Sequence, residues 1–170
     1  MKNCGKVFEQ ELKDSLKVYI AERKYYYYRF NDGTASFGGT SEDVRFQQSN
    51  ICDCEVFNTE SRTLYFLELK THKGASIPFS AILGANKVSG LKKLRKMANA
   101  NTYNGIVAGY LINFREHEKA YFVNAEEVEI FILADERKSI PLEWCKQYGQ
   151  DVPMRKLRTN YRLDVENLIV

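Results

Sequence analysis

Three side chains near the middle of the chain have types and spacing that suit metal-assisted chemistry. Asp53 precedes the segment RTLYFLELKT (62–71), in which Glu68 and Lys70 are separated by a single residue. Alternate side chains of a strand point to the same face, so Glu68 and Lys70 emerge side by side from an otherwise apolar strand. Because the two segments belong to one hairpin, Asp53 can bring a second carboxylate to the side of Glu68.

This arrangement predicts a site for a hard divalent cation. Two carboxylates, helped by a backbone carbonyl such as that of Leu69, are the oxygen ligands that Mg²⁺ prefers, and Mn²⁺ can substitute for it. Such a metal lowers the pKa of a bound water and offsets charge on a phosphate under in-line attack. The ammonium of Lys70 can orient the nucleophile or stabilise the developing negative charge.

The same residues have a plainer interpretation. A Glu–Lys pair on an edge strand is often a surface ion pair that performs no chemistry. Two features instead favour a metal site that cleaves phosphodiesters, as in a nuclease. The charges end an apolar strand, and a basic helix follows directly. Glu55 shares a face with Asp53, but we interpret it as a solvated residue and leave it out of the core set.

The hydrophobic pattern predicts the elements that must position these side chains. We expect helices at 5–22, 79–100, 125–134, 141–148 and 163–169, strands at 24–30, 44–57, 62–71, 105–114 and 120–124, and loops at 31–40 and 72–78. Alternate tyrosines within 25–28 are expected to pack the core and cover a sheet face rather than stack on unpaired bases. The order of elements predicts an α/β fold, a sandwich with a mixed sheet.

Composition sets the limits on the class of protein. The 170 residues, 44% of them hydrophobic and 13% aromatic, predict a single domain (1–170) with a real core. No apolar run approaches the roughly 20 residues of a membrane helix, and the N-terminus has no export signal. Four cysteines without a disulfide pattern indicate a reducing compartment. Cys52 and Cys54, if they lie on a strand, share a face as small core residues, and their spacing does not suit zinc.

Charge is distributed unevenly along the chain. Residues 61–119 hold 10 Lys and Arg against 3 Asp and Glu, whereas the segments on either side are slightly acidic, so the net charge of +3 is an average. Such local excess lets a nearly neutral protein hold a polyanion, although a solvated lysine face would look the same. The residues that we expect to contact DNA are Lys73, Lys87, Lys92, Lys93, Lys96, Arg155, Lys156 and Arg158.

Several short motifs together resemble the RecU-type Holliday junction resolvases of Gram-positive bacteria and their phages, which belong to the restriction-endonuclease-like, PD-(D/E)xK nuclease superfamily. The resemblance follows the same order over nearly the whole chain. The matching segments are Gly5-x-x-Phe8-Glu9-x-x-Leu12, Phe46-x-Gln48-Ser49-x-x-Cys52-Asp53, Phe66-x-Glu68-x-Lys70-Thr71, Ile77-Pro78-Phe79, Asn86-Lys87-Val88-x-x-Leu91-Lys92, 138–143 and 162–164. Asn86 and Lys87 replace the polar pair of the family's helix.

The resemblance implies a restriction-endonuclease-like mixed central sheet flanked by helices, and a homodimeric endonuclease of the cytoplasm. It would require Mg²⁺ and resolve four-way DNA junctions by paired symmetric nicks in recombination and repair. Asp53 and Glu68 would bind metal, Lys70 would act in catalysis, and Glu9 would complete or support the metal site. Branched DNA, a second copy of the chain and recombination proteins are the implied partners.

Two alternatives remain open. One is a structure- or sequence-directed DNA endonuclease of the same fold, and the other is a DNA-binding relative without catalytic activity. The segment 31–43 stands where the family inserts a stalk into the junction, but it is rich in Gly, Ser and Thr and contains no Lys or Arg. It is expected to form a loop or a short stalk.

Overall fold

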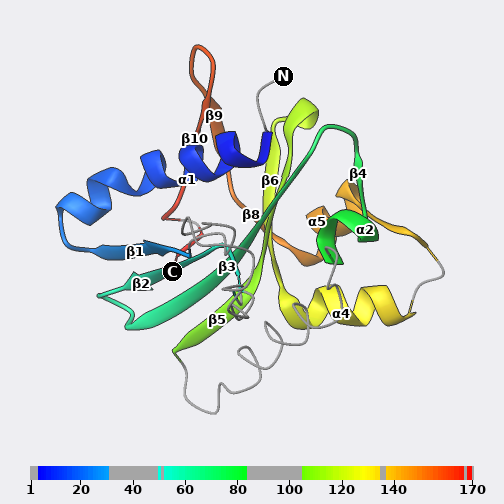
Figure 1. Cartoon of the computed structure of the whole chain (residues 1–170), viewed down its shortest axis with the longest axis horizontal. Coiled ribbons are helices and arrows are strands. Elements are labelled where there is room, and N and C mark those ends of the chain that lie inside the picture. Colours follow the sequence, from blue (N-terminus) through cyan, green and yellow to red (C-terminus); the bar gives the residue numbers. More distant parts are fainter. Residues whose placement is uncertain are drawn as a thin grey trace, which may run out of the picture.

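The computed structural model describes residues 4–30, 50, 52–83, 105–134, 137–166 and 168–169, and a mixed sheet lies at its centre (Figure 1). The sheet order is β1-β2-β3-β5-β6-β8, in which β3 and β5 are parallel and the other neighbours are antiparallel. These strands are β1 (Tyr25–Arg29), β2 (Cys54–Asn58), β3 (Thr63–His72), β5 (Ile106–Phe114), β6 (Lys119–Asn124) and β8 (Gln150–Asp151). The mixed central sheet predicted from the sequence is confirmed.

Helices cover both faces of the sheet. Helix α1 (Cys4–Ala21) lies along one face, and α2 (Phe79–Leu83), α4 (Ala125–Ala134) and α5 (Leu142–Tyr148) lie on the other side (Figure 1). Phe8, Leu12 and Leu16 recur at helical spacing and are all buried, which is why α1 presents one apolar face to the strands. The sheet is therefore the middle layer of three.

Strand β3 contributes side chains to both cores. Tyr65 and Leu67 are buried with the α1 face, whereas Leu64 and Phe66 pack with Val128 of α4 on the other face. This alternation is the one predicted from the sequence. It places Glu68 and Lys70 on the same face of β3 as Phe66, which is the face towards α4. The strand that carries the acidic residue is thus held from both sides.

Short strands complete the fold and were not predicted. The segment 72–78, expected to be a loop, contains β4 (Ser76–Pro78), which pairs with β7 (Ser139–Pro141). The tail contains a hairpin of β9 (Met154–Lys156) and β10 (Tyr161–Leu163). The helix predicted at 163–169 is wrong, because the described residues after Leu163 form no helix. Val165 accepts backbone hydrogen bonds from Leu168 and Ile169 in a single turn. The 3-10 turn η1 (Arg115–His117) links β5 and β6.

The tyrosines behave as expected, whereas the two cysteines do not share a face. Cys52 and Cys54 are both buried, but they enter different cores, because the chain bends at 52–53 before β2 begins. Tyr25 is buried and Tyr27 half-buried against the α1 core, whereas Tyr26 and Tyr28 are exposed. The segment 31–43 and most of the helix predicted at 79–100 lie outside the described residues. Within the described ranges, no helix is long and apolar enough to cross a bilayer.

Candidate active site

The candidate site forms where β2 separates from β3. Cys54 is paired with Leu67, and the backbone N–H of Asp53 still donates to the Leu67 carbonyl at 3.2 Å. The next N–H of β3 that faces this edge, that of Leu69, donates instead to Oδ2 of Asp53 at 2.6 Å. The Asp53 side chain therefore replaces a backbone acceptor of the sheet, which fixes its carboxylate against the end of β3.

Glu68 and Lys70 lie together at this end of β3. Their side chains form an ion pair of 2.6 Å and are only 20% and 21% exposed. Burial raises the pKa of the Glu68 carboxyl, and the negative charge of Asp53 raises it further, although Lys70 acts in the opposite direction. The structure thus brings Asp53, Glu68 and Lys70 together, as the sequence predicted.

Two neutral side chains flank the acidic pair. Burial raises the pKa of the Cys52 thiol to about 12, and the charges of Glu68 and Asp53 add to the effect. Tyr110, paired with Glu68 across β3 and β5, is buried, and its pKa is also raised by burial and by Glu68. A thiol and a phenol that stay protonated near neutral pH do not compete with the carboxylates for a hard cation.

Glu9 of α1 is held by another partner. Its Oε2 lies 2.7 Å from the Arg29 guanidinium at the end of β1. Within the described ranges, no group of three or more His, Cys, Asp or Glu side chains lies close enough to hold a metal ion. The role of Glu9 as a metal ligand, and that of the Leu69 carbonyl, therefore stay predictions.

The paired carboxylates nevertheless fit a divalent cation. Asp53 and Glu68 are close enough for the charge of one to raise the pKa of the other, and a partly buried pair of like charges is relieved by a cation between them. Both are hard oxygen donors of the kind that Mg²⁺ and Mn²⁺ prefer. Asp53, Glu68 and Lys70 are therefore suited to metal-assisted attack on a phosphodiester.

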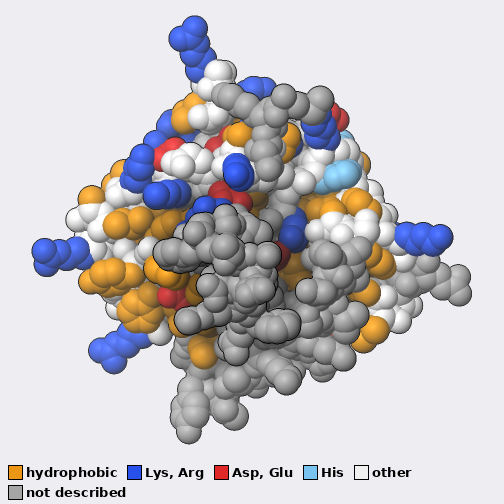
Figure 2. All heavy atoms as spheres, viewed as in Figure 1, with side chains coloured by type: hydrophobic (Ala, Val, Ile, Leu, Met, Phe, Trp, Pro, Cys, Tyr) orange, Lys and Arg blue, Asp and Glu red, His pale blue; other side chains and the backbone are white. Residues whose placement is uncertain are grey.

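The predicted DNA-binding residues fall into two groups. Lys73, Arg155, Lys156 and Arg158 are exposed, whereas Lys87, Lys92, Lys93 and Lys96 lie outside the described residues. Figure 2 shows Lys and Arg side chains gathered around acidic ones near the middle of one face. Lys156 is partly neutralised by an ion pair with Glu118, so Arg155 and Arg158 are the stronger candidates of the tail.

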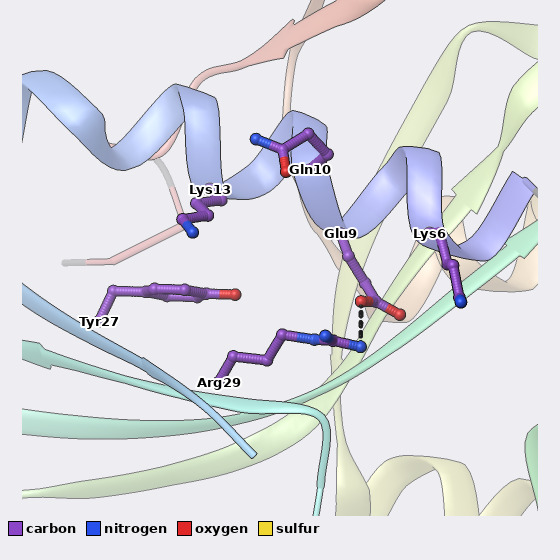
Figure 3. Close-up of a pocket in the computed structure, with 6 residues that line it drawn as sticks. All are labelled: Lys6, Glu9, Gln10, Lys13, Tyr27 and Arg29. Carbon is purple, nitrogen blue, oxygen red and sulfur yellow. Dashed lines mark ion pairs between the residues drawn. The ribbon is translucent and has the colours of Figure 1, made fainter. Parts of the chain in front are cut away.

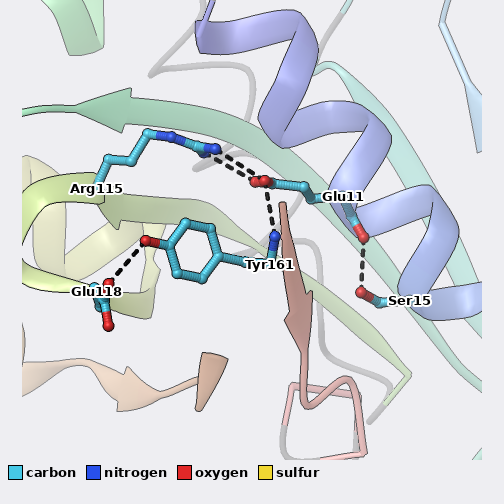
Figure 4. Close-up of polar contacts among 5 residues, drawn as sticks. All are labelled: Glu11, Ser15, Arg115, Glu118 and Tyr161. Carbon is cyan, nitrogen blue, oxygen red and sulfur yellow. Dashed lines mark hydrogen bonds and ion pairs between the residues drawn. The ribbon is translucent and has the colours of Figure 1, made fainter. Parts of the chain in front are cut away.

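The basic tail is a hairpin fixed to α1 by a buried acid (Figure 4). Glu11 is 2% exposed and accepts two hydrogen bonds from Arg115, at 3.0 and 2.9 Å, and one from the backbone N–H of Tyr161 at 3.0 Å. The hydroxyl of Ser15 accepts from the N–H of Leu163 at 2.9 Å. These contacts join segments far apart in the sequence, and sequence reasoning missed them.

The raised pKa of Glu68 predicts a stability effect. A carboxyl whose pKa is raised on folding disfavours the folded state once it ionises, so wild-type stability is lost as the pH rises through that pKa. We expect Glu68→Gln without divalent metal to raise the free energy of unfolding at pH 8 by about 1 kcal/mol. The gain should shrink towards pH 4, as measured by urea denaturation.

Glu60→Gln is the matched control for this measurement. Glu60 lies exposed in the turn between β2 and β3, so its replacement should change the free energy of unfolding by less than about 0.5 kcal/mol at either pH. A loss of stability at pH 8 in Glu68→Gln would contradict the expected repulsion between the Glu68 and Asp53 carboxylates.

Comparisons with known proteins give a relative and a structural neighbour. No protein-family model matches the chain. The SPbeta prophage-derived uncharacterized protein YotM of Bacillus subtilis (strain 168) is 30% identical over 172 residues, which cover 94% of this chain and 81% of that protein. The Holliday junction resolvase Hjc of the archaeal hyperthermophile Archaeoglobus fulgidus matches with a TM-score of 0.48 and 16% identity, over 84% of this chain and 94% of Hjc.

Proposed function

We propose that this chain, which belongs to the family of the SPbeta prophage-derived protein YotM, is a divalent-metal-dependent DNA endonuclease that resolves four-way junctions. The observation that supports the proposal is the junction of β2 and β3, where the charge of Asp53 raises the pKa of Glu68 and Lys70 lies 2.6 Å from Glu68. A domain that only bound DNA would gain nothing from two carboxylates directed at phosphates.

Each side chain of the site has a distinct role. Asp53 and Glu68 would hold Mg²⁺ or Mn²⁺, with the Leu69 carbonyl and Glu9 as further ligands. The bound metal would supply a water of lowered pKa and offset charge on the phosphate. Lys70, kept near Glu68 by its ion pair, would orient the attacking water or stabilise the charge that develops on the phosphate oxygens.

Exposed basic residues would hold the DNA outside this site. Arg155 and Arg158 lie on the hairpin that Glu11 and Arg115 fix to α1, and Lys73 follows the strand that carries Glu68. Guanidinium and ammonium groups on a rigid support bind backbone phosphates without reading the sequence. This distribution suits a protein that selects its substrate by shape.

The finer activity follows from the resemblance to RecU-type resolvases. A homodimer would place two sites on one junction and so cut strands in symmetric pairs. Recombination proteins of the cell would then be its functional partners. Sedimentation at micromolar concentration should accordingly find a dimer.

One substrate panel tests the proposal. The protein is incubated with Mg²⁺ and with equal amounts of an end-labelled four-way junction, a fork and a linear duplex, and the nicks are mapped on a denaturing gel. We expect nicks at symmetric positions of the junction, and none in EDTA. Because Mn²⁺ accepts the same oxygen ligands, it should restore activity after EDTA treatment and metal exchange.

The alternatives give other patterns. Equal cutting of all three substrates would favour a different endonuclease of the same fold. Tight binding without nicks in Mg²⁺ or Mn²⁺ would indicate a DNA-binding relative that lacks catalytic activity. Asp53→Asn, purified in parallel, controls for a contaminating nuclease.

A further inference from the structure

A basic groove lies between α1 and β1 (Figure 3). It has a volume of about 290 Å³ and opens to solvent. The residues that line it are Lys6, Glu9, Gln10, Lys13, Tyr27 and Arg29. All six are polar or amphipathic, so the groove suits a charged ligand rather than an apolar one.

The charges of the groove favour an anion. Lys6, Lys13 and Arg29 supply three positive charges against the single negative charge of Glu9. Lys6 and Lys13 lie seven residues apart, which places them on one face of α1, and neither has an ion-pair partner within the described part of the chain. The Arg29 guanidinium is held by Glu9 at 2.7 Å.

Tyr27 supplies a neutral donor to the same groove. Its ring lies below α1 with the hydroxyl directed into the space between Lys13 and Arg29 (Figure 3). Burial raises the pKa of this phenol, so the hydroxyl keeps its proton and can donate a hydrogen bond to an anion. The set of ammonium, guanidinium and hydroxyl donors is the kind that contacts DNA phosphates.

The groove borders the segment that carries Asp53, from the α1 face of the sheet. Arg29 pairs with Cys54 across β1 and β2, and the N–H of Phe30 donates to the Asp53 carbonyl at 3.0 Å. The basic end of the groove is thus one strand position from Asp53. A strand whose scissile phosphate lies at Asp53 and Glu68 would carry a neighbouring phosphate towards Arg29.

We propose that the groove between α1 and β1 binds a backbone phosphate of the DNA next to the scissile one, and that this phosphate displaces Glu9 from Arg29. The inference rests on the proposed function, since it takes DNA as the ligand. In the DNA-free protein the Glu9 carboxylate neutralises the Arg29 guanidinium. A phosphate of the DNA would take the place of this carboxylate. This phosphate would then be contacted by Lys6, Lys13 and Tyr27 without repulsion from the Glu9 carboxylate.

Removal of the lysines tests the groove. Binding of a fluorescein-labelled four-way junction is measured by fluorescence anisotropy in EDTA at several KCl concentrations. Each of Lys6→Ala and Lys13→Ala should weaken binding, and the double variant should lower the salt slope by about one, the contribution of one neutralised phosphate. Lys17→Ala is the matched control, because Lys17 lies one turn further along α1, outside the groove, and is paired with Asp14 at 2.6 Å.

Removal of the competing carboxylate tests the displacement. Glu9→Gln should bind the junction more tightly in EDTA by about three- to tenfold, because the phosphate no longer competes with the Glu9 carboxylate for its charge-assisted contact to Arg29. Glu22→Gln changes the net charge equally and breaks a surface ion pair with Lys24, yet it lies away from the groove and should change affinity less than twofold.

These outcomes separate the groove from the nuclease. Equal salt slopes in the wild type and the double lysine variant would overturn the groove, even in a protein that cuts junctions with Mg²⁺. Equal affinities of Glu9→Gln and Glu22→Gln would overturn the displacement. If the double lysine variant has a reduced salt slope but the wild type cuts no substrate, DNA binding in the groove would be supported and the proposed endonuclease activity would be contradicted.

Discussion

Replacement of either acid of the site is expected to slow nicking by orders of magnitude while DNA binding survives. Asp53→Asn and Glu68→Gln should each lower the rate of Mg²⁺-dependent junction cleavage by about 10²- to 10³-fold, the loss typical of removing charge stabilisation from an active site. Both variants keep the size of the side chain. In Asp53→Asn the amide oxygen can still accept the hydrogen bond from the Leu69 N–H, so the divergence of β2 and β3 is retained.

Rate and affinity must be measured separately for these variants. Single-turnover cleavage of a labelled junction gives the rate, and anisotropy in Ca²⁺ or EDTA gives the affinity, which should change less than about threefold. Glu60→Gln, in the exposed turn between β2 and β3, controls for loss of one negative charge. Cleavage at the wild-type rate by either variant would exclude the Asp53–Glu68 pair from the mechanism.

Loss of the Arg115 guanidinium is expected to have the largest effect on folding. Glu11 is 2% exposed, and Arg115 is its charged partner through two hydrogen bonds. Arg115→Met would leave a buried carboxylate uncompensated, which costs about 3–5 kcal/mol of the free energy of unfolding. The hairpin of β9 and β10, which rests on Glu11 through Tyr161, should open with it.

Urea denaturation of three variants resolves this prediction. Lys156→Ala is the matched control, because its ion pair with Glu118 lies at the surface and should contribute little to the free energy of unfolding. The double variant Glu11→Gln with Arg115→Met should recover much of the lost stability, since Gln is neutral and still accepts from the Tyr161 N–H. If Arg115→Met unfolds at the same urea concentration as Lys156→Ala, Glu11 has another means of compensation.

The central strand could be predicted because its pattern is local. Tyr65, Phe66 and Leu67 are consecutive and point alternately to the two faces of the strand. Because all three are apolar, the sequence predicts burial on both sides of the sheet. The position of Glu68 and Lys70 at the end of β3 follows from the same periodicity. Asp53 could be placed beside them because a short hairpin limits the distance between two strands.

Other features depend on contacts between distant segments. Strands β4 and β7 have three residues each, too few for a periodic signal, and their pairing joins residues more than 60 positions apart. The pairs of Glu11 with Arg115 and of Glu9 with Arg29 likewise join different elements. A charged residue on an amphipathic helix looks the same in sequence whether a partner from another segment covers it or not. The groove between α1 and β1 was missed for this reason.

The hydrogen bond from the Leu69 amide to Asp53 gives the site an internal spectroscopic probe. An amide proton held by a carboxylate at 2.6 Å senses the charge of that carboxylate, so its NMR chemical shift reports on whatever binds there. Because β3 is covered on both faces, this proton should also exchange slowly with solvent. A metal titration followed at this one amide would observe the occupancy of Asp53 without substrate and without turnover.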